Sequence, residues 1–203
     1  MMTQLETEVK LYYPDLGQLE AQLRQYADLI HDRIYEQNTR YDLDDKSLTK
    51  RGTVIRLRQD ESVKLTYKEP GSIERGIITR EELEVEVSDF DTMQKILNKF
   101  GYTSAMTYEK YRTTYAWHGT HIMLDELPYG NFIEIEGNSA DIETVLKELG
   151  LTDVQRREDS YSKLFDYVKH HLELTFRDLT FDNFADIDVP ESAFIAPGSI
   201  IIR

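Results

Sequence analysis

Short runs in which charged and apolar residues alternate recur along this chain of 203 residues, and they constrain the fold more than any other feature. Side chains two positions apart on a strand point to the same face of a sheet. In the first run Glu6, Glu8 and Lys10 therefore share one face, while Val9 and Leu11 point to the other. The pattern predicts strands over Leu5–Leu11, Asn38–Asp42, Thr53–Arg58, Ser62–Lys68, Ile78–Val87, Thr107–Tyr115, His121–Leu127 and Phe132–Glu136.

The charged faces of these runs are sorted by sign. The cationic pairs are Arg56/Arg58, Lys64/Lys68 and Lys110/Arg112, and the acidic pairs are Glu82/Glu84 and Glu134/Glu136. A face that is merely solvated usually mixes both signs with neutral polar residues. A half-buried antiparallel sheet with one face in water is the alternative interpretation. The sorting instead favours charges that face one another across an enclosed space.

Amphipathic helical segments lie between the strands and offer apolar faces to cover the outside of the sheet. They are predicted from Leu16 to Ile30 with Asp15 as N-cap, and over Phe90–Phe100, Ala140–Leu149 and Ser160–Leu174. Many short strands with few helices are typical of a sheet that closes into a barrel. The sequence therefore predicts an α+β chain, mainly β, with a charged, wet interior and helices packed outside.

Acids and cations within one cavity indicate a particular ligand chemistry. Clustered carboxylates bind Mg²⁺ or Mn²⁺, and clustered lysines and arginines bind phosphate oxygens. Together they predict a site for a complex of polyphosphate and metal. A lipocalin-like carrier is a poorer alternative, because it needs an apolar lumen.

Composition excludes several other classes of protein. The formal net charge of −14 argues against general binding to nucleic acid or to anionic membranes. The absence of cysteine excludes disulfides and Cys–zinc sites. No apolar run reaches the roughly 18 residues of a membrane span, and the segment from Met1 to Glu6 lacks the apolar stretch of a signal peptide. We therefore expect a cytoplasmic protein.

A series of motifs follows in a specific order. It begins with Glu6-Thr7-Glu8-Val9-Lys10, an E-x-E-x-K pattern. The later motifs are Asn38–Asp42, Val54–Arg58, Lys64–Lys68, Arg80–Glu84, Lys110–Arg112, Leu124-Asp125, Gly130–Glu136 and Ser160-Tyr161. In kind and order, over about residues 3–172, they resemble the CYTH, or triphosphate tunnel metalloenzyme, superfamily. That family includes class IV adenylate cyclases, thiamine triphosphatases and inorganic triphosphatases.

The resemblance implies a closed, eight-stranded antiparallel β-barrel, and it implies roles for the charged residues. Divalent metal, Mg²⁺ or Mn²⁺, would be held by Glu6, Glu8, Asp125, Glu134 and Glu136. Triphosphate would be held by Lys10, Arg56, Arg58, Lys64, Lys110 and Arg112. A second tier would comprise Glu82, Glu84, Lys68 and Arg40. Arg40 departs from the family pattern, where small or aromatic residues are commoner, and we expect it at the substrate end of the tunnel.

The motifs leave the reaction open. The favoured hypothesis is a metal-dependent phosphohydrolase acting on inorganic, nucleoside or thiamine triphosphate. One alternative is a class IV adenylate cyclase that forms cyclic AMP and pyrophosphate from ATP, and another is a non-catalytic module that binds polyphosphate or nucleotide. Glu8 and Lys10 are the candidate catalytic residues. Lys10 would orient or deprotonate the nucleophile if neighbouring cations depress its pKa.

The chain divides into a tunnel domain over residues 1–175 and a C-terminal extension over residues 176–203. The extension contains Pro190, Pro197 and Gly198 and ends in an apolar run. We expect it to pack on the domain surface or to be partly mobile. The expected partner is a small molecule that contains a triphosphate. The sequence leaves the oligomeric state open, and a homodimer is one alternative.

Overall fold

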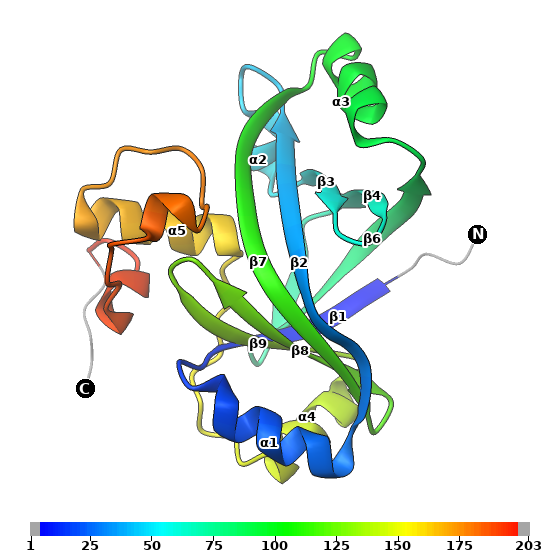
Figure 1. Cartoon of the computed structure of the whole chain (residues 1–203), viewed down its shortest axis with the longest axis vertical. Helices are drawn as coiled ribbons and strands as arrows, with labels where there is room; N and C mark the ends of the chain where they lie inside the picture. Colours follow the sequence, from blue (N-terminus) through cyan, green and yellow to red (C-terminus); the bar gives the residue numbers. More distant parts are fainter. Residues whose placement is uncertain (1–4, 199–203) are drawn as a thin grey trace.

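The computed structural model describes residues 5–198, which form one antiparallel sheet closed into a barrel (Figure 1). The strands are β1 (Leu5–Tyr12), β2 (Asp28–Asp42), β3 (Val54–Gln59), β4 (Val63–Lys68), β5 (Ser72–Glu74), β6 (Ile77–Val87), β7 (Thr103–Trp117), β8 (Thr120–Leu127) and β9 (Gly130–Glu136). Their order is β1-β9-β8-β7-β2-β3-β4-β6, and pairing of β1 with β6 closes the ring. The short β5 is an addition beside β6. The predicted closed, eight-stranded antiparallel barrel is confirmed.

Helices cover much of the outside of this barrel. They are α1 (Leu16–Tyr26), α2 (Ser47–Arg51), α3 (Phe90–Lys99), α4 (Ser139–Glu148) and α5 (Tyr161–Leu172). Figure 1 shows α1 and α4 on one side, against β1, β8 and β9, with α3 and α5 on other sides. Leu23 of α1 and Ile142 of α4 are fully buried against Val9 and Ile135, which point away from the barrel interior. Each such side chain contributes roughly 1.5–3 kcal/mol to folding.

The first helix ends earlier than predicted. The apolar spacing suggested that it continues to Ile30, but α1 ends at Tyr26 and β2 begins at Asp28. Pairing of β2 with β7 along Asp28–Asp42 overrides the local helical periodicity, and Ile30 is left 46% exposed. The N-cap was predicted correctly, because the Asp15 side chain accepts a hydrogen bond from the Gly17 N–H. This extension of β2 lengthens the wall of the barrel.

The C-terminal segment packs against α5 and the β8–β9 turn (Figure 1). Leu179 pairs with β7, accepting a hydrogen bond from the Glu109 N–H and donating one to the Thr107 carbonyl. Two short 3₁₀ turns follow, η1 (Asp182–Phe184) and η2 (Glu191–Phe194), which bury Phe184 and Phe194 in the same apolar cluster. The apolar end of the sequence falls in residues 199–203, outside the described range.

Asp42 stabilises the connection between β2 and β3 through hydrogen bonds. Its buried carboxylate accepts hydrogen bonds from the Leu43, Leu48 and Thr49 N–H groups and from the Thr49 hydroxyl, at 2.6–3.0 Å. Burial alone would raise the pKa of Asp42, but these hydrogen bonds outweigh it and lower the pKa below its usual value. The carboxylate therefore stabilises the fold only while it is ionised.

We expect Asp42→Ala to lower the free energy of unfolding by about 2–3 kcal/mol at neutral pH, since three backbone donors lose their acceptor. The pKa of Asp42 is depressed in the folded protein. The loss of unfolding free energy in Asp42→Ala is therefore greatest above the unfolded-state pKa of about 4, and it shrinks as pH falls through the folded-state pKa. Urea unfolding at several pH values measures it. The exposed Asp44→Ala serves as control, and an equal effect of both variants would contradict this role.

Candidate active site

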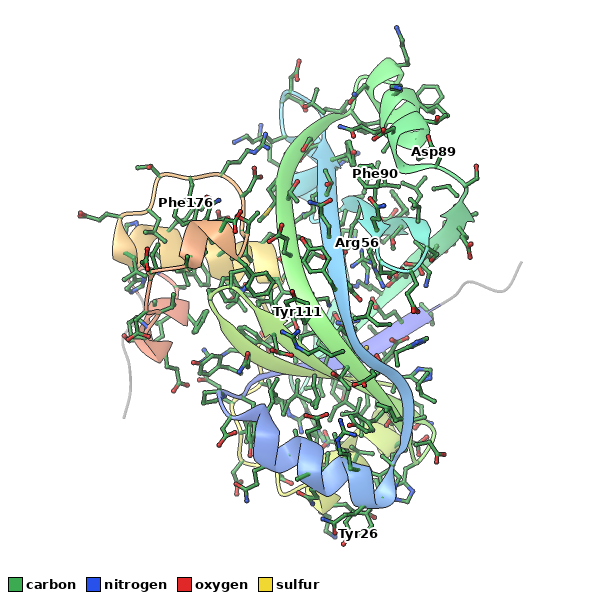
Figure 2. The ribbon with its side chains drawn as sticks, viewed as in Figure 1. Tyr26, Arg56, Asp89, Phe90, Tyr111 and Phe176 are labelled. Carbon is green, nitrogen blue, oxygen red and sulfur yellow. The ribbon has the colours of Figure 1, made fainter. Side chains whose placement is uncertain are left out.

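The barrel holds a cavity of about 820 Å³, and more than half of the residues that line it are charged. The inward face of each strand supplies the side chains that alternation placed together. In Figure 2 the labelled Arg56 lies among the strands in the middle of the molecule, whereas Tyr26 and Phe176 lie at its periphery. The predicted site residues on the wall are Glu6, Glu8, Lys10, Arg40, Arg56, Arg58, Lys64, Lys68, Glu82, Glu84, Lys110, Arg112, Glu134 and Glu136. Among the predicted site residues, only Asp125 is absent from that wall.

Asp125 lies behind two of the cations. It is fully buried, and its oxygens accept hydrogen bonds from Lys110 at 2.9 Å, from the fork of Arg112 at 2.6 Å twice, and from the Tyr161 hydroxyl at 2.8 Å. A bidentate guanidinium–carboxylate pair fixes both distance and plane. Asp125 therefore holds Lys110 and Arg112 in position on the wall. Its oxygens face these donors rather than the cavity. This orientation does not suit the role of metal ligand that the resemblance implied for Asp125.

A second group of cations surrounds Glu84 and Glu36. Glu84 lies 3.6 Å from Arg56, Arg58 and Lys64, and Glu36 lies 3.7 Å from Arg58 and 3.5 Å from Lys110. Burial opposes ionisation of both acids, but the cations prevail and lower the pKa of each. These acids are ionised and separate cations that would otherwise repel one another. Each acid is shared by several cations, so the cations keep an excess of positive charge that can bind a multiply charged anion.

Acids dominate the opposite part of the wall, where β1 meets β6 and β9. Glu8 lies opposite Glu136 in the β1–β9 register, and Glu134 lies opposite Lys10. Burial and the nearby Glu134 carboxylate raise the pKa of Glu8, and burial together with Glu6 and Glu8 raises that of Glu136. Among residues 5–198 no cation lies within 4.0 Å of Glu136. Negative charge is therefore in excess here.

Glu6 and Glu82 interact directly at the edge of this acidic region. Burial alone would raise the pKa of Glu6, but Lys68 and Arg80 help to lower it to about 2. Burial and a hydrogen bond with Glu6 raise the pKa of Glu82 to about 7. Arg80 donates to Glu6 at 2.7 Å and to Glu8 at 2.8 Å, so it bridges two of the predicted ligands.

The donor chemistry of the acidic region fits a divalent cation. Carboxylate oxygens are the ligands that Mg²⁺ and Mn²⁺ prefer, and a cation would relieve the repulsion that raises the pKa of Glu8 and Glu136. In the described part of the chain, however, no three such side chains converge closely enough to form a complete metal site. Glu6 and Glu8 are instead engaged by Arg80. The acids thus supply suitable ligands but not a preformed cage.

Lys10 does not have the depressed pKa that a general base would need. Burial alone would lower it, but Glu134 at 3.3 Å and Glu8 outweigh that effect and raise the pKa of the ammonium. The ammonium also lies 4.4 Å from the centre of the Tyr161 ring. The condition set from the sequence for proton removal by Lys10, a depressed pKa, is therefore not met, because Glu134 and Glu8 outweigh the effects of burial and of Arg80.

Three residues that support the site were missed. Glu36 precedes the predicted start of its strand at Asn38, although Glu36, Asn38 and Arg40 alternate as the other strands do. Tyr161 was noted only as part of a motif, and nothing in its spacing revealed the bond to Asp125. Tyr108 was likewise unassigned, yet its hydroxyl lies 3.4 Å from Arg56 on the cavity wall.

The sequence as a whole also matches a described family. A sequence model of the CYTH domain matches residues 4–161. The chain belongs to the CYTH domain family. The matched region of this CYTH protein includes every strand of the barrel and ends at Tyr161, the first residue of α5.

Similar proteins carry the names of nucleotide enzymes. A candidate adenylate cyclase of Methanocaldococcus jannaschii is 26% identical over 150 aligned residues, and the match covers 71% of this CYTH protein and 85% of that relative. The structure of a candidate adenylate cyclase from Vibrio parahaemolyticus has a TM-score of 0.68 at 19% identity, covering 81% of this chain and 99% of that one. A candidate adenylyl cyclase from Hippeastrum, described as having a dominant triphosphatase activity, has a TM-score of 0.58 at 18% identity, covering 85% and 97%. At such identities the two structures support the shared fold.

Within residues 5–198, the helices are all too short or too polar to cross a membrane.

Proposed function

We propose that this chain is a divalent-metal-dependent phosphohydrolase that acts on a triphosphate inside the tunnel, with inorganic, nucleoside and thiamine triphosphate as candidate substrates. One observation carries the proposal: a group of cations and a group of carboxylates, from several strands of the barrel, line the same cavity. The triphosphatase activity described for the Hippeastrum protein supports hydrolysis in this fold.

The cations hold the triphosphate in this proposal. Lys10, Arg56, Arg58, Lys64, Lys110 and Arg112 all reach the cavity, and they come from strands on different sides of the barrel. Guanidinium forks and ammonium groups fixed by carboxylates bind phosphate oxygens without large rearrangement. Because the ammonium of Lys10 stays protonated, its proposed role is to bind phosphate and to orient the attacking water, rather than to remove a proton.

The metal ligands in this proposal are Glu6, Glu8, Glu134 and Glu136. Bound Mg²⁺ or Mn²⁺ would neutralise charge that develops on the phosphate oxygens during transfer. Glu82 and Lys68 form the adjoining second tier, since Lys68 pairs with both Glu6 and Glu82 at 2.9 Å and 2.5 Å. We reassign Asp125 from metal ligand to positioning residue for Lys110 and Arg112.

A cyclase is the second candidate, favoured by the names of the Methanocaldococcus and Vibrio relatives. It would use the same tunnel, with the ribose 3′-hydroxyl attacking the α-phosphorus of ATP and expelling pyrophosphate. A non-catalytic binding module is less favoured, because an anion binder gains little from acids such as Glu8 and Glu136 in the cavity wall.

Product analysis separates these functions. The protein is incubated with Mg²⁺ or Mn²⁺ and, separately, inorganic triphosphate, ATP and thiamine triphosphate. We expect metal-dependent release of orthophosphate that a chelator abolishes. Cyclic AMP and pyrophosphate from ATP would show the cyclase instead, and ligand binding that persists in chelator without any product would show the binding module.

A further inference from the structure

Arg40 is set apart from the other cations of the tunnel. It lies opposite Arg56 in the β2–β3 register, and its guanidinium donates a hydrogen bond to the Ser162 hydroxyl in the first turn of α5. Every other lysine or arginine of the wall has a carboxylate within 4.0 Å. Across residues 5–198, no carboxylate lies that close to Arg40. Its positive charge is therefore uncompensated by a contacting acid.

Arg56 adds to this local excess of positive charge. It is 8% exposed, and its Nε atom is buried without a hydrogen-bond partner in the described part of the chain. Its nearest acid, Glu84, is shared with Arg58 and Lys64. Like charges directly opposite each other on neighbouring strands repel. An anion between Arg40 and Arg56 would relieve that repulsion.

Two serines at this end of the tunnel also suit an anion, although Glu158 lies next to them in the cavity lining. Ser160 and Ser162 line the cavity, with their hydroxyls 3.0 Å apart. They belong to the N-cap and first turn of α5, whose backbone N–H groups favour negative charge. Tyr108 and Tyr161 are buried and leave little aromatic surface for stacking. A purine or thiazolium ring would find hydroxyls and a guanidinium here instead of an apolar platform.

We propose that Arg40, Arg56 and Ser162 form an anion subsite at the α5 end of the tunnel, and that this subsite selects a linear inorganic polyphosphate over a triphosphate carrying a neutral or cationic organic group. The inference rests on the proposed function, because it names the substrate class of the same tunnel. Arg40 is its specificity-determining residue.

Equilibrium binding in the presence of chelator tests the subsite without relying on turnover. Inorganic triphosphate and thiamine triphosphate are titrated into the full chain and into Arg40→Gln, Arg40→Lys and Ser162→Ala. We expect wild type to bind inorganic triphosphate at least about tenfold more tightly than thiamine triphosphate, the size of one charged hydrogen bond. Arg40→Gln should remove that preference, Arg40→Lys should keep most of it, and Ser162→Ala should reduce it. The exposed Arg24→Gln on α1 is the matched control and should leave it unchanged.

Two results would overturn the subsite. One is equal binding of both ligands by wild type, which would mean that the organic group is accommodated elsewhere, for example at the end lined by Asp60 and Glu61. The other is an equal loss of affinity for inorganic triphosphate and for thiamine triphosphate in Arg40→Gln, which would make Arg40 a general phosphate contact. Failure of the proposed function looks different: the binding preference would be present, but no orthophosphate would appear with Mg²⁺ or Mn²⁺.

Discussion

Glu8→Gln is expected to lower kcat/KM for inorganic triphosphate by about a hundredfold or more, while the melting temperature stays the same or rises. Substitutions even in the outer shell of a metal site reduce affinity or activity by about 10–100-fold, and we place Glu8 among the ligands themselves. Burial and Glu134 raise the pKa of Glu8, so its ionised form is disfavoured in the folded protein. Neutral glutamine removes that repulsion. Activity and stability should therefore change independently of each other.

A phosphate-release assay and a thermal melt on the same preparation measure both effects. Higher Mn²⁺ concentrations should partly restore turnover in Glu8→Gln, because a weakened metal site can be filled by mass action. The control is Glu126→Gln, which removes an outward-facing carboxylate of β8 paired with the partly exposed Arg33. The ligand role fails if Glu8→Gln retains wild-type kcat/KM, or if its loss of activity is accompanied by an equal loss of stability and no response to Mn²⁺.

Asp125→Ala is expected to destabilise the protein by about 3–5 kcal/mol, because removal of one partner leaves buried charges uncompensated. Lys110 would keep only Glu36 at 3.5 Å, and Arg112 would keep Glu134 at 2.5 Å and Glu36 at 3.9 Å. Asp125→Asn should show a smaller loss of stability, since it preserves shape and one acceptor. In both variants KM for triphosphate should rise, because two phosphate-binding cations lose their fixed orientation.

Tyr161→Phe provides the matched control for Asp125. It removes a single hydrogen bond to the same carboxylate and should lower the free energy of unfolding by only about 1 kcal/mol. Urea unfolding of the three variants, together with steady-state kinetics, gives the comparison. Asp125→Asn with wild-type stability and KM would exclude the positioning role and return Asp125 to the metal ligands as a hypothesis.

The parity of charged residues on strands predicted most of the tunnel wall, for a simple physical reason. Alternation has a period of two, so Glu6, Glu8 and Lys10 must share a face wherever β1 lies. Antiparallel pairing then brings Glu136 opposite Glu8 and Glu134 opposite Lys10. The order of strands and the pairing of β1 with β6 do not follow from alternation alone and were not predicted. Only the number of strands in the closed barrel, eight, entered through the resemblance to a known family.

The parts that could not be predicted depend on contacts between distant segments. The end of α1 was misplaced because local helical spacing continues past Tyr26, whereas pairing with β7 draws Ile30 into β2. The direction of the Lys10 pKa shift depends on which of several charges is closest, and sequence separation does not supply that distance. The role of Tyr161 likewise arises only when α5 brings it beside Asp125, 36 positions away.

The central claim is that one tunnel holds the phosphates on its cationic wall and the metal on its acidic wall. A crystal structure with Mn²⁺ and a non-hydrolysable imido analogue of inorganic triphosphate tests it most directly. We predict an anomalous manganese peak beside the carboxylates of Glu8 and Glu136, and phosphates against Arg56, Arg58 and Arg112. Phosphates bound outside the barrel, or manganese away from every acid of the β1–β9 wall, would contradict it.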